Sequence, residues 1–366
     1  MAERDASLTY TQHLRLEQLL SCQERQSEIK GQPAHDEMLF IVVHQAYELW
    51  FKLILFELDR IQEIFAGPVT DDREIGQAVQ GLIRIAKIQK LLIEQLEVLE
   101  TMTPQDFLEF RDLLFPASGF QSLQFRLLET RLGLPRDQRL NFANKPYDAM
   151  LSEAERARIA AAEAAPSLLA QLEAWLERTP FVSQAGYEFS AAYRQAILQA
   201  LGGDQEAMRR NPALVEAALE AELASLDAAL TQFESIFDEA AHAKLAAEGV
   251  WRLSSKALQA ALFINLYRDE PVLQLPFRLL SVLMDIDENL STWRYRHALM
   301  AQRMIGRKVG TGGSSGFDYL RRTAERHRIF GDLFALSTYF LPRSKLPPLP
   351  EELRRVMGYS YAEKGA

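Results

Sequence analysis

The chain of 366 residues has little of three things: cysteine, positive charge and long unbroken apolar runs. Cys22 is the one cysteine, which excludes a disulfide within the chain and any zinc or iron–sulfur site built from several cysteines. The net charge of −9 provides no electrostatic footprint for nucleic acid. We therefore expect a protein of the reducing cytoplasm that binds no nucleic acid.

The most apolar stretch, MLFIVVHQAYELWFKLILFEL, is interrupted by four polar residues: His44, Gln45, Glu48 and Lys52. It predicts a buried core helix rather than a membrane span. The first residues, MAERDASLTY, are too polar and acidic for a signal peptide. No membrane association is expected.

Apolar residues recur at helical spacing along almost the whole chain, and the two-residue alternation of strands is nearly absent. The fold expected is all-α and a single domain over 1–366, with an N-terminal segment 1–35, a peripheral helical insertion at about 150–245 and a proline-rich tail 343–366. Helices are predicted at 14–23, 36–66, 71–100, 104–115, 119–133, 152–177, 185–201, 213–247, 254–267, 276–306 and 315–337.

Two of the six histidines fall on apolar helix faces. His297 continues the stripe of Leu290 and Trp293, with Arg294 and Arg296 expected on the outer face. In the helix from 36, an apolar stripe includes His44, and its other members are Phe40, Tyr47, Phe51, Ile54 and Leu58. Both histidines are therefore predicted to point inward.

An inward histidine has two interpretations. The plainer one is a core residue that forms a hydrogen bond with a backbone carbonyl, since an unpaired buried polar group costs roughly 1–3 kcal/mol. The other is a cofactor ligand: neither helix offers a second ligand for a protein-only metal cage, but one axial histidine is what a haem iron requires. The sequence has no CxxCH, so any haem would be held without covalent linkage.

Arg111 is crowded by Phe107, Phe110 and Phe115, which predicts a partly buried guanidinium. It would pair with a carboxylate from the protein or from a ligand, and the sequence leaves both possibilities open. Ser118 precedes a new helical segment and is a candidate N-cap.

The stretch KVGTGGSSGF, residues 308–317, invites a phosphate-loop interpretation that its spacing does not support. Ser315 stands where a dinucleotide fingerprint needs its third glycine, and no lysine follows at the P-loop position. The residues before it predict a helix, whereas both motifs require a strand.

Several long strings together resemble the tryptophan 2,3-dioxygenase family. The resemblance runs in order from about Tyr10 to Arg343 and is weaker in 150–245. The strings that carry it are DEMLFIVVHQAYELWFKLILFEL, FRDLLFPASGFQSLQFRLLE, RLSSKALQAALFINLYRDEP and LMDIDENLSTWRYRHALMAQRMIGRKVGTGGSSGFDYLR.

The resemblance implies a fold of the tryptophan/indoleamine dioxygenase type, with one haem b in each subunit of a homotetramer, a dimer of dimers. His297, within WRYRH, matches the axial ligand of the haem iron. Ser118 matches a serine close to the haem, and Gly310 is also expected beside the cofactor. The haem is ferrous in the active enzyme, and O2 is the co-substrate.

The same resemblance assigns the substrate site. His44 matches a distal histidine near the indole nitrogen, Arg111 grips the substrate carboxylate, and Thr311 contacts the amino-acid end. The glycine-rich loop then becomes a substrate lid. The remaining positions expected along the pocket are Phe40, Ile41, Val42, Val43 and Phe107, together with Tyr10 and Leu14 from a neighbouring subunit.

Two positions depart from the family pattern, where His13 and Phe125 stand in place of tyrosines. The activity implied is insertion of O2 across the C2–C3 bond of L-tryptophan to give N-formyl-L-kynurenine, the first step of tryptophan catabolism by the kynurenine pathway. Two alternatives remain: a related haem oxygenase acting on a modified indole or another aromatic amino acid, and a non-catalytic helical scaffold or haem carrier.

Overall fold

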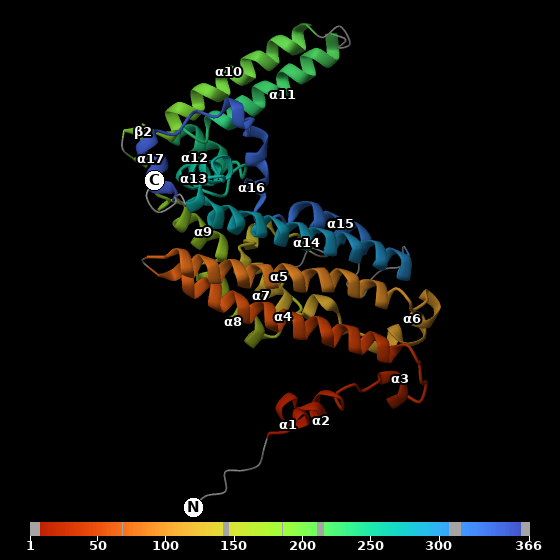
Figure 1. Ribbon diagram of the computed structural model, residues 1–366. Helices are drawn as coiled ribbons and strands as arrows, with labels where there is room; N and C mark the ends of the chain where they lie inside the picture. Colours follow the sequence, from red (N-terminus) through yellow and green to blue (C-terminus); the bar gives the residue numbers. More distant parts are fainter. Residues whose placement is uncertain are drawn as a thin grey trace, which may run out of the picture.

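The computed structural model describes residues 8–67, 69–141, 146–184, 186–210, 216–306 and 316–359. Across these residues the protein is built from helices, which confirms the all-α prediction (Figure 1). The exception is one antiparallel pair of two-residue strands, β1 (Ser183–Gln184) and β2 (Tyr187–Glu188).

Three long helices form the centre of the molecule: α4 (Glu37–Ala66), α5 (Asp72–Leu99) and α14 (Gln274–Ile305). α5 lies between the other two and packs against both (Figure 1). A capping box formed by Asp71 and Glu74 begins α5. At the other end of the set, Gly306 ends α14 with a φ of 58°, a conformation that glycine adopts without steric cost.

The core side chains of α4 and α14 show that these helices run antiparallel. Tyr47 contacts Trp293, and one small cavity is lined by residues further along both helices, among them Ile54 and Leu290. Residue numbers therefore rise along α4 while they fall along α14. His44 and His297 consequently lie at the same level, one turn beyond the Tyr47–Trp293 contact.

Shorter helices surround this centre. Those nearest the two histidines are α6 (Pro104–Arg111), η1 (Asp112–Leu114), η2 (Gly119–Gln121), α7 (Leu123–Leu132) and α15 (Gly316–Arg326). The others are α3 (Gln26–Ile29), η3 (Arg136–Gln138), α8 (Glu153–Ala164), α9 (Leu168–Leu176), α10 (Phe189–Arg210), α11 (Glu216–Glu234), α12 (Glu239–Ala247), α13 (Ser255–Leu266), η4 (Pro271–Leu273), α16 (Gly331–Ala335), η5 (Leu336–Tyr339), η6 (Arg343–Lys345) and α17 (Glu351–Met357).

Several predicted helices are wrong because each is divided in the structure; the helix at 119–133, for example, is divided at Ser122 into η2 and α7. The helix at 152–177 breaks at Pro166, which lacks the N–H that a continuing helix needs, and Ser167 caps α9. The helix at 213–247 breaks where Asp238 caps α12. The helix at 315–337 ends at Arg326, because the following backbone bonds to the core instead: Asp287 accepts the N–H of Ile329 at 2.9 Å.

The paired helices α10 and α11, within the region 150–245, project from the body (Figure 1). α10 extends beyond its predicted end at 201 to Arg210. The tail contains the short helix α17, which the proline-rich sequence did not predict.

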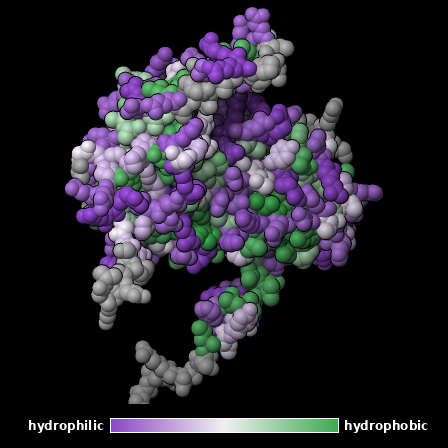
Figure 2. Space-filling view, turned by 45° about the horizontal axis from the view of Figure 1, so that its top comes forward, coloured by the Kyte–Doolittle hydropathy of each residue, from purple (hydrophilic) through white to green (hydrophobic). Residues whose placement is uncertain are grey.

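An N-terminal arm extends from the opposite side of the body (Figure 1). Here the predicted helix 14–23 is replaced by α1 (Tyr10–Leu14) and α2 (Leu16–Leu19), separated by Arg15 with a φ of 54°. Apolar side chains follow the arm and its root (Figure 2). Neither helix buries a residue, and the exposed apolar side chains are Leu8, Tyr10, Leu14, Leu19 and Leu20.

The prediction of a fully buried helix at 36–66 needs a correction. One face of α4 packs into the core, but the opposite face exposes Met38, Val42, Leu49 and Phe56. By length and composition alone, α4 is the one described helix that could cross a membrane. Its contacts with α5, α7 and α9 make it a framework helix of this fold.

Candidate active site

For His44, a predicted site residue, the structure determines which ring nitrogen carries the proton. Its Nδ1 lies 2.7 Å from the carbonyl oxygen of Phe40, one turn earlier on α4. A carbonyl only accepts, so Nδ1 carries the proton, and Nε2 of the neutral ring keeps a free lone pair. Part of the side chain is accessible to solvent although protein surrounds much of the ring, so His44 lies at the edge of the core rather than within it.

Neighbouring protein groups determine the pKa of the His44 ring and hence its charge. Burial lowers its pKa, while the Phe40 carbonyl and the Glu48 carboxylate partly offset that effect. Glu48 is held in place by Ser122 Oγ at 2.6 Å and by Gln124 Nε2 at 2.8 Å. The ring is therefore neutral at pH 7 and can accept a hydrogen bond through Nε2.

His297 stands on α14 opposite His44 and is half-buried. Its ring stacks on Trp293, with centroids 5.2 Å apart and planes 11° from parallel. Burial lowers its pKa to about 4, and the charge of His44 contributes to the lowering. The antiparallel packing of α4 and α14 places His297 at the level of His44, and both rings are neutral at pH 7 because both pKa values are lowered.

The deeply buried histidines are two others. His327 and His242 are 3% and 9% exposed, so neither lies at the surface that the two predicted site histidines share. His327 lies just beyond α15 and accepts the N–H of Leu140 at 3.3 Å, a tertiary contact that no helical periodicity predicts. His327 is therefore a core histidine, whereas the bond to a backbone carbonyl expected of a core histidine is formed by His44.

An aromatic wall adjoins His44. Phe40 packs on His44 with ring centroids 4.0 Å apart and on Phe107 of α6 at 5.8 Å. Phe110 closes the group, 5.5 Å from Phe107. Arg111 follows Phe107 by one helical turn and is half-buried, as predicted. The structure thus brings His44 together with the two phenylalanines predicted for an indole pocket, and Arg111 lies one turn along α6 from Phe107.

Ser118 caps η2, which confirms its prediction as an N-cap. Its Oγ accepts the N–H of Phe120 at 3.4 Å, and its own N–H donates to Gln121 Oε1 at 2.9 Å. Ser122, at the end of η2, is the residue that binds Glu48. The PASGFQS turn is therefore tied to α4 one turn after His44.

Arg294 contradicts its predicted place on an outer helix face. It is 3% exposed, and its guanidinium lies 2.7 Å from Glu129 Oε1 and 3.1 Å from the carbonyl of His327. Arg139 and Arg126 contact the same carboxylate at 2.9 and 3.3 Å. Three arginines thus share one carboxylate, because Glu129 on α7 is in reach of both α14 and the segment after η3.

These surroundings fit a haem. Within the described ranges no three His, Cys, Asp or Glu side chains form a metal cluster, so a metal here would need a ligand that supplies most of its own coordination. Flat aromatic walls and one axial histidine suit that ligand. The three arginines around Glu129 exceed its charge, and Nε of Arg126 has no described hydrogen-bond partner, which suits an anionic cofactor edge.

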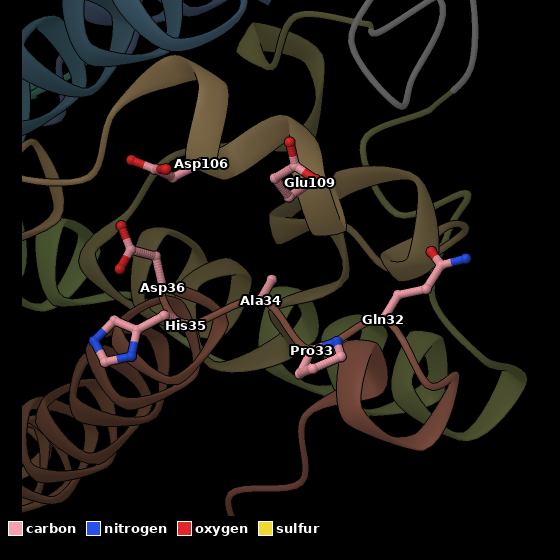
Figure 3. A pocket seen from close by; sticks show the side chains of 7 residues that line it. All are labelled: Gln32, Pro33, Ala34, His35, Asp36, Asp106 and Glu109. Atoms are coloured by element: carbon pink, nitrogen blue, oxygen red, sulfur yellow. The ribbon is translucent and has the colours of Figure 1, made fainter.

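A pocket of about 470 Å³ lies elsewhere, between the start of α4 and α6 (Figure 3). Asp106 and Glu109 line it from α6, and His35 and Asp36 line it from the segment before α4. Phe107 and Arg111 do not line it. α6 therefore contributes to two surfaces, and the acidic one is separate from the histidine pair.

Not every predicted site residue joins this group. Val43 is packed in the core at 4% exposure, Ile41 is half-buried, and Val42 lies on the exposed face of α4. Tyr10 and Leu14 lie on the arm, 74% and 42% exposed. Gly310 and Thr311 lie outside the described residues, as does the loop 307–315 to which they belong.

Three residues of the site were not found from the sequence: Glu48, Tyr47 and Trp293. Glu48 is one turn from His44, and Trp293 is one turn from His297. The available signal was that a helix places residues four apart on one face, which makes Glu48 a neighbour of His44 and Trp293 a neighbour of His297. Helical periodicity placed Tyr47 and Trp293 only among the members of the apolar stripes.

Comparison with known proteins now gives the family. The family profile described as tryptophan 2,3-dioxygenase matches residues 1–340. The chain belongs to the tryptophan 2,3-dioxygenase family. A relative of that name from Bdellovibrio bacteriovorus is 49% identical over 352 residues, covering 96% of this chain and 98% of its own. Those from Xenopus laevis and Dictyostelium discoideum are 47% and 44% identical, each over 96% of this chain and over 86% and 88% of their own.

Proposed function

We propose that the chain is a haem dioxygenase that inserts both atoms of O2 across the C2–C3 bond of L-tryptophan to give N-formyl-L-kynurenine. Membership of the tryptophan 2,3-dioxygenase family supports the reaction. The observation that carries the assignment of roles is the pair of neutral histidines, His44 and His297, beside the wall of Phe40 and Phe107. The pH profile and variants described below test these roles.

His297 would hold the iron of haem b through a ring nitrogen. Its low pKa keeps the ring unprotonated, as a metal ligand must be. The arginines around Glu129 and the capped PASGFQS turn at Ser118 would face the rest of the cofactor. The haem supplies the ferrous iron that allows O2 to react with an aromatic ring.

The protein itself binds and orients the substrate. Arg111 and Thr311 would hold the carboxylate and amino-acid end, and Phe40 and Phe107 would exclude water and select a flat ring. His44 would accept a hydrogen bond from the indole N–H through Nε2. Neutral imidazole is too weak a base to remove an indole proton, so this bond positions the ring without obligatory proton abstraction.

The acid limb of the pH profile should report His44. Its pKa is lowered, so the ring loses its acceptor only as the pH falls below its ordinary value of 6.5. We expect kcat/KM for tryptophan to be level near neutrality and to fall at a pH clearly below 6.5. The His44→Ser enzyme should have lower kcat/KM and lack this limb, whereas His35→Ser should keep it. A limb unchanged in His44→Ser would refute the role.

We propose a homotetramer, a dimer of dimers, in which Tyr10 and Leu14 complete the site of a neighbouring subunit. The support is the arm itself: it buries none of its residues on its own chain, yet carries five exposed large apolar side chains. The exposed apolar face of α4 offers further surface for contact between copies.

Co-expression of two variants tests whether neighbouring subunits contribute to the same site. Tyr10→Ala and Arg111→Ala should each be impaired when expressed alone. Co-expressed, they should recover activity, because one site in a mixed pair combines an intact Tyr10 with an intact Arg111. Size-exclusion chromatography with light scattering gives the oligomeric state in parallel. If the mixture is no more active than the average of the two variants, each subunit completes its own site.

The proposed compartment is the cytoplasm. Cys22, an exposed free cysteine, is compatible with a reducing environment.

A further inference from the structure

Trp293 has a closely defined environment behind His297. Its ring is 5.2 Å from Phe125 and 6.1 Å from Tyr47, while its other side stacks on His297. Phe51 packs on both Phe125 and Tyr47. Side chains from α4 and α7 thus pack against the indole, and the His297 ring stacks on it.

A hydrogen-bonded chain fixes the indole within this group. Trp293 Nε1 donates to Tyr47 Oη at 3.4 Å, the long end of the range, and Tyr47 Oη donates to the carbonyl of Leu92 on α5 at 2.5 Å. Burial raises the pKa of Tyr47 to about 12, so its hydroxyl stays protonated and serves as both donor and acceptor. Phe125 has no hydroxyl, which leaves Tyr47 as the acceptor.

Packing contacts do not enclose the indole completely. A cavity of about 10 Å³, lined by Phe51, Phe125, Leu290 and Trp293 among others, adjoins the ring. This is close to the space that one water molecule needs. The hydrogen bond to Tyr47 therefore adds to packing in fixing the orientation of the indole.

His297 depends on that orientation. Within the described part of the chain, neither of its ring nitrogens has a hydrogen-bond partner that would fix the ring, unlike His44, which bonds to Phe40. Histidines that bind metals commonly donate their second N–H to a carbonyl or carboxylate that fixes the ring plane. Here the nearly parallel face of Trp293 is the contact that can do so.

We propose that Tyr47 and Trp293 are positioning residues that set the plane of the His297 ring and thereby the geometry of its bond to the haem iron. The inference rests on the proposed function, in which His297 is the axial ligand. Leu92 links the arrangement to α5, so the central helix of the fold controls the ligand on α14.

The test compares Tyr47→Phe, Trp293→Phe and the double variant as haem-loaded proteins. Resonance Raman spectra of the ferrous proteins should show an iron–histidine stretching band that is shifted and broadened in each variant. Haem transfer to apomyoglobin should be roughly fivefold faster, the effect of losing one hydrogen bond. The double variant should resemble Trp293→Phe, because that change already removes the bond to Tyr47.

Tyr193→Phe is the matched control. Tyr193 is also buried and donates its hydroxyl to a main-chain carbonyl, that of Tyr339, far from the histidines in the fold. It should keep the wild-type band and the wild-type rate of haem transfer. If Tyr47→Phe fails to fold, Trp293→Phe carries the test, since it leaves the bond from Tyr47 to Leu92 in place.

The proposal is overturned if the band and the transfer rate stay at wild-type values, if Tyr193→Phe changes them equally, or if the two single effects add. A wild-type protein with no histidine-ligated haem spectrum would instead refute the proposed function, and this role with it. A folded variant that loses haem while Tyr193→Phe retains it supports the proposal.

Discussion

The His297→Ala protein is expected to purify without haem and to form no N-formyl-L-kynurenine. His297 is the ring that α14 would offer to the iron in the proposed site, so its removal would leave the haem without that ligand. The measurement is the visible spectrum after expression with a haem supply, before and after reduction and with tryptophan added, together with product formation. The loss should be complete within detection.

A useful control is His35→Ala, which removes an exposed histidine from the acidic pocket. It should bind haem and turn over tryptophan as the wild type does. Free imidazole added to His297→Ala should restore part of the haem spectrum, which separates a missing ligand from a misfolded chain. A wild-type spectrum in His297→Ala would mean that the ring is a core residue and that the iron lies elsewhere.

Arg111→Ala is expected to raise the KM for L-tryptophan strongly and to lower kcat/KM about a hundredfold, the usual scale for removing one partner of a charge-assisted pair. A half-buried guanidinium beside Phe107 can bind a carboxylate with limited competition from water. The loss should fall mainly on KM, because the bond is made in the ground state as well as in the transition state. Steady-state kinetics measure the two parameters.

Tryptamine, which lacks the carboxylate of tryptophan, tests whether Arg111 binds that group. Wild-type enzyme should discriminate against tryptamine, and Arg111→Ala should remove most of that preference. Arg296→Ala is the matched control, since Arg296 is also half-buried but lies near Glu97 and Glu100. An unchanged KM for tryptophan in Arg111→Ala would refute the role of Arg111.

The sequence predicts the long helices well and the short ones poorly, for a physical reason. In α4, α5 and α14, many turns repeat the same apolar face, so the pattern locates each helix to within about two residues. Shorter helices end where one local event outweighs propensity. At Pro166 that event is visible in the sequence, but beyond Arg326 it is a bond to Asp287, which lies about forty positions earlier.

The site follows the same division. Helical spacing identified His44 and His297 as candidate site residues, and resemblance to the family suggested their roles. Spacing could not show that His44 is exposed or that Arg294 is buried, because Arg294 owes its burial to Glu129 on another helix. Nor could it show that Nδ1 of His44 is occupied by a carbonyl, which decides the nitrogen that faces a ligand.

The antiparallel arrangement of α4 and α14 places the residues that pack the core at one end of the pair and the two histidines toward the other. The fully buried residues of α4 are concentrated after Tyr47 and most of those of α14 lie before Trp293, so both helices are anchored at the same end. The histidines stand toward the other end, where fewer side chains are enclosed. Substitutions at the end that carries the histidines therefore meet fewer packing constraints than substitutions at the anchored end, so the first end can change while the architecture is kept.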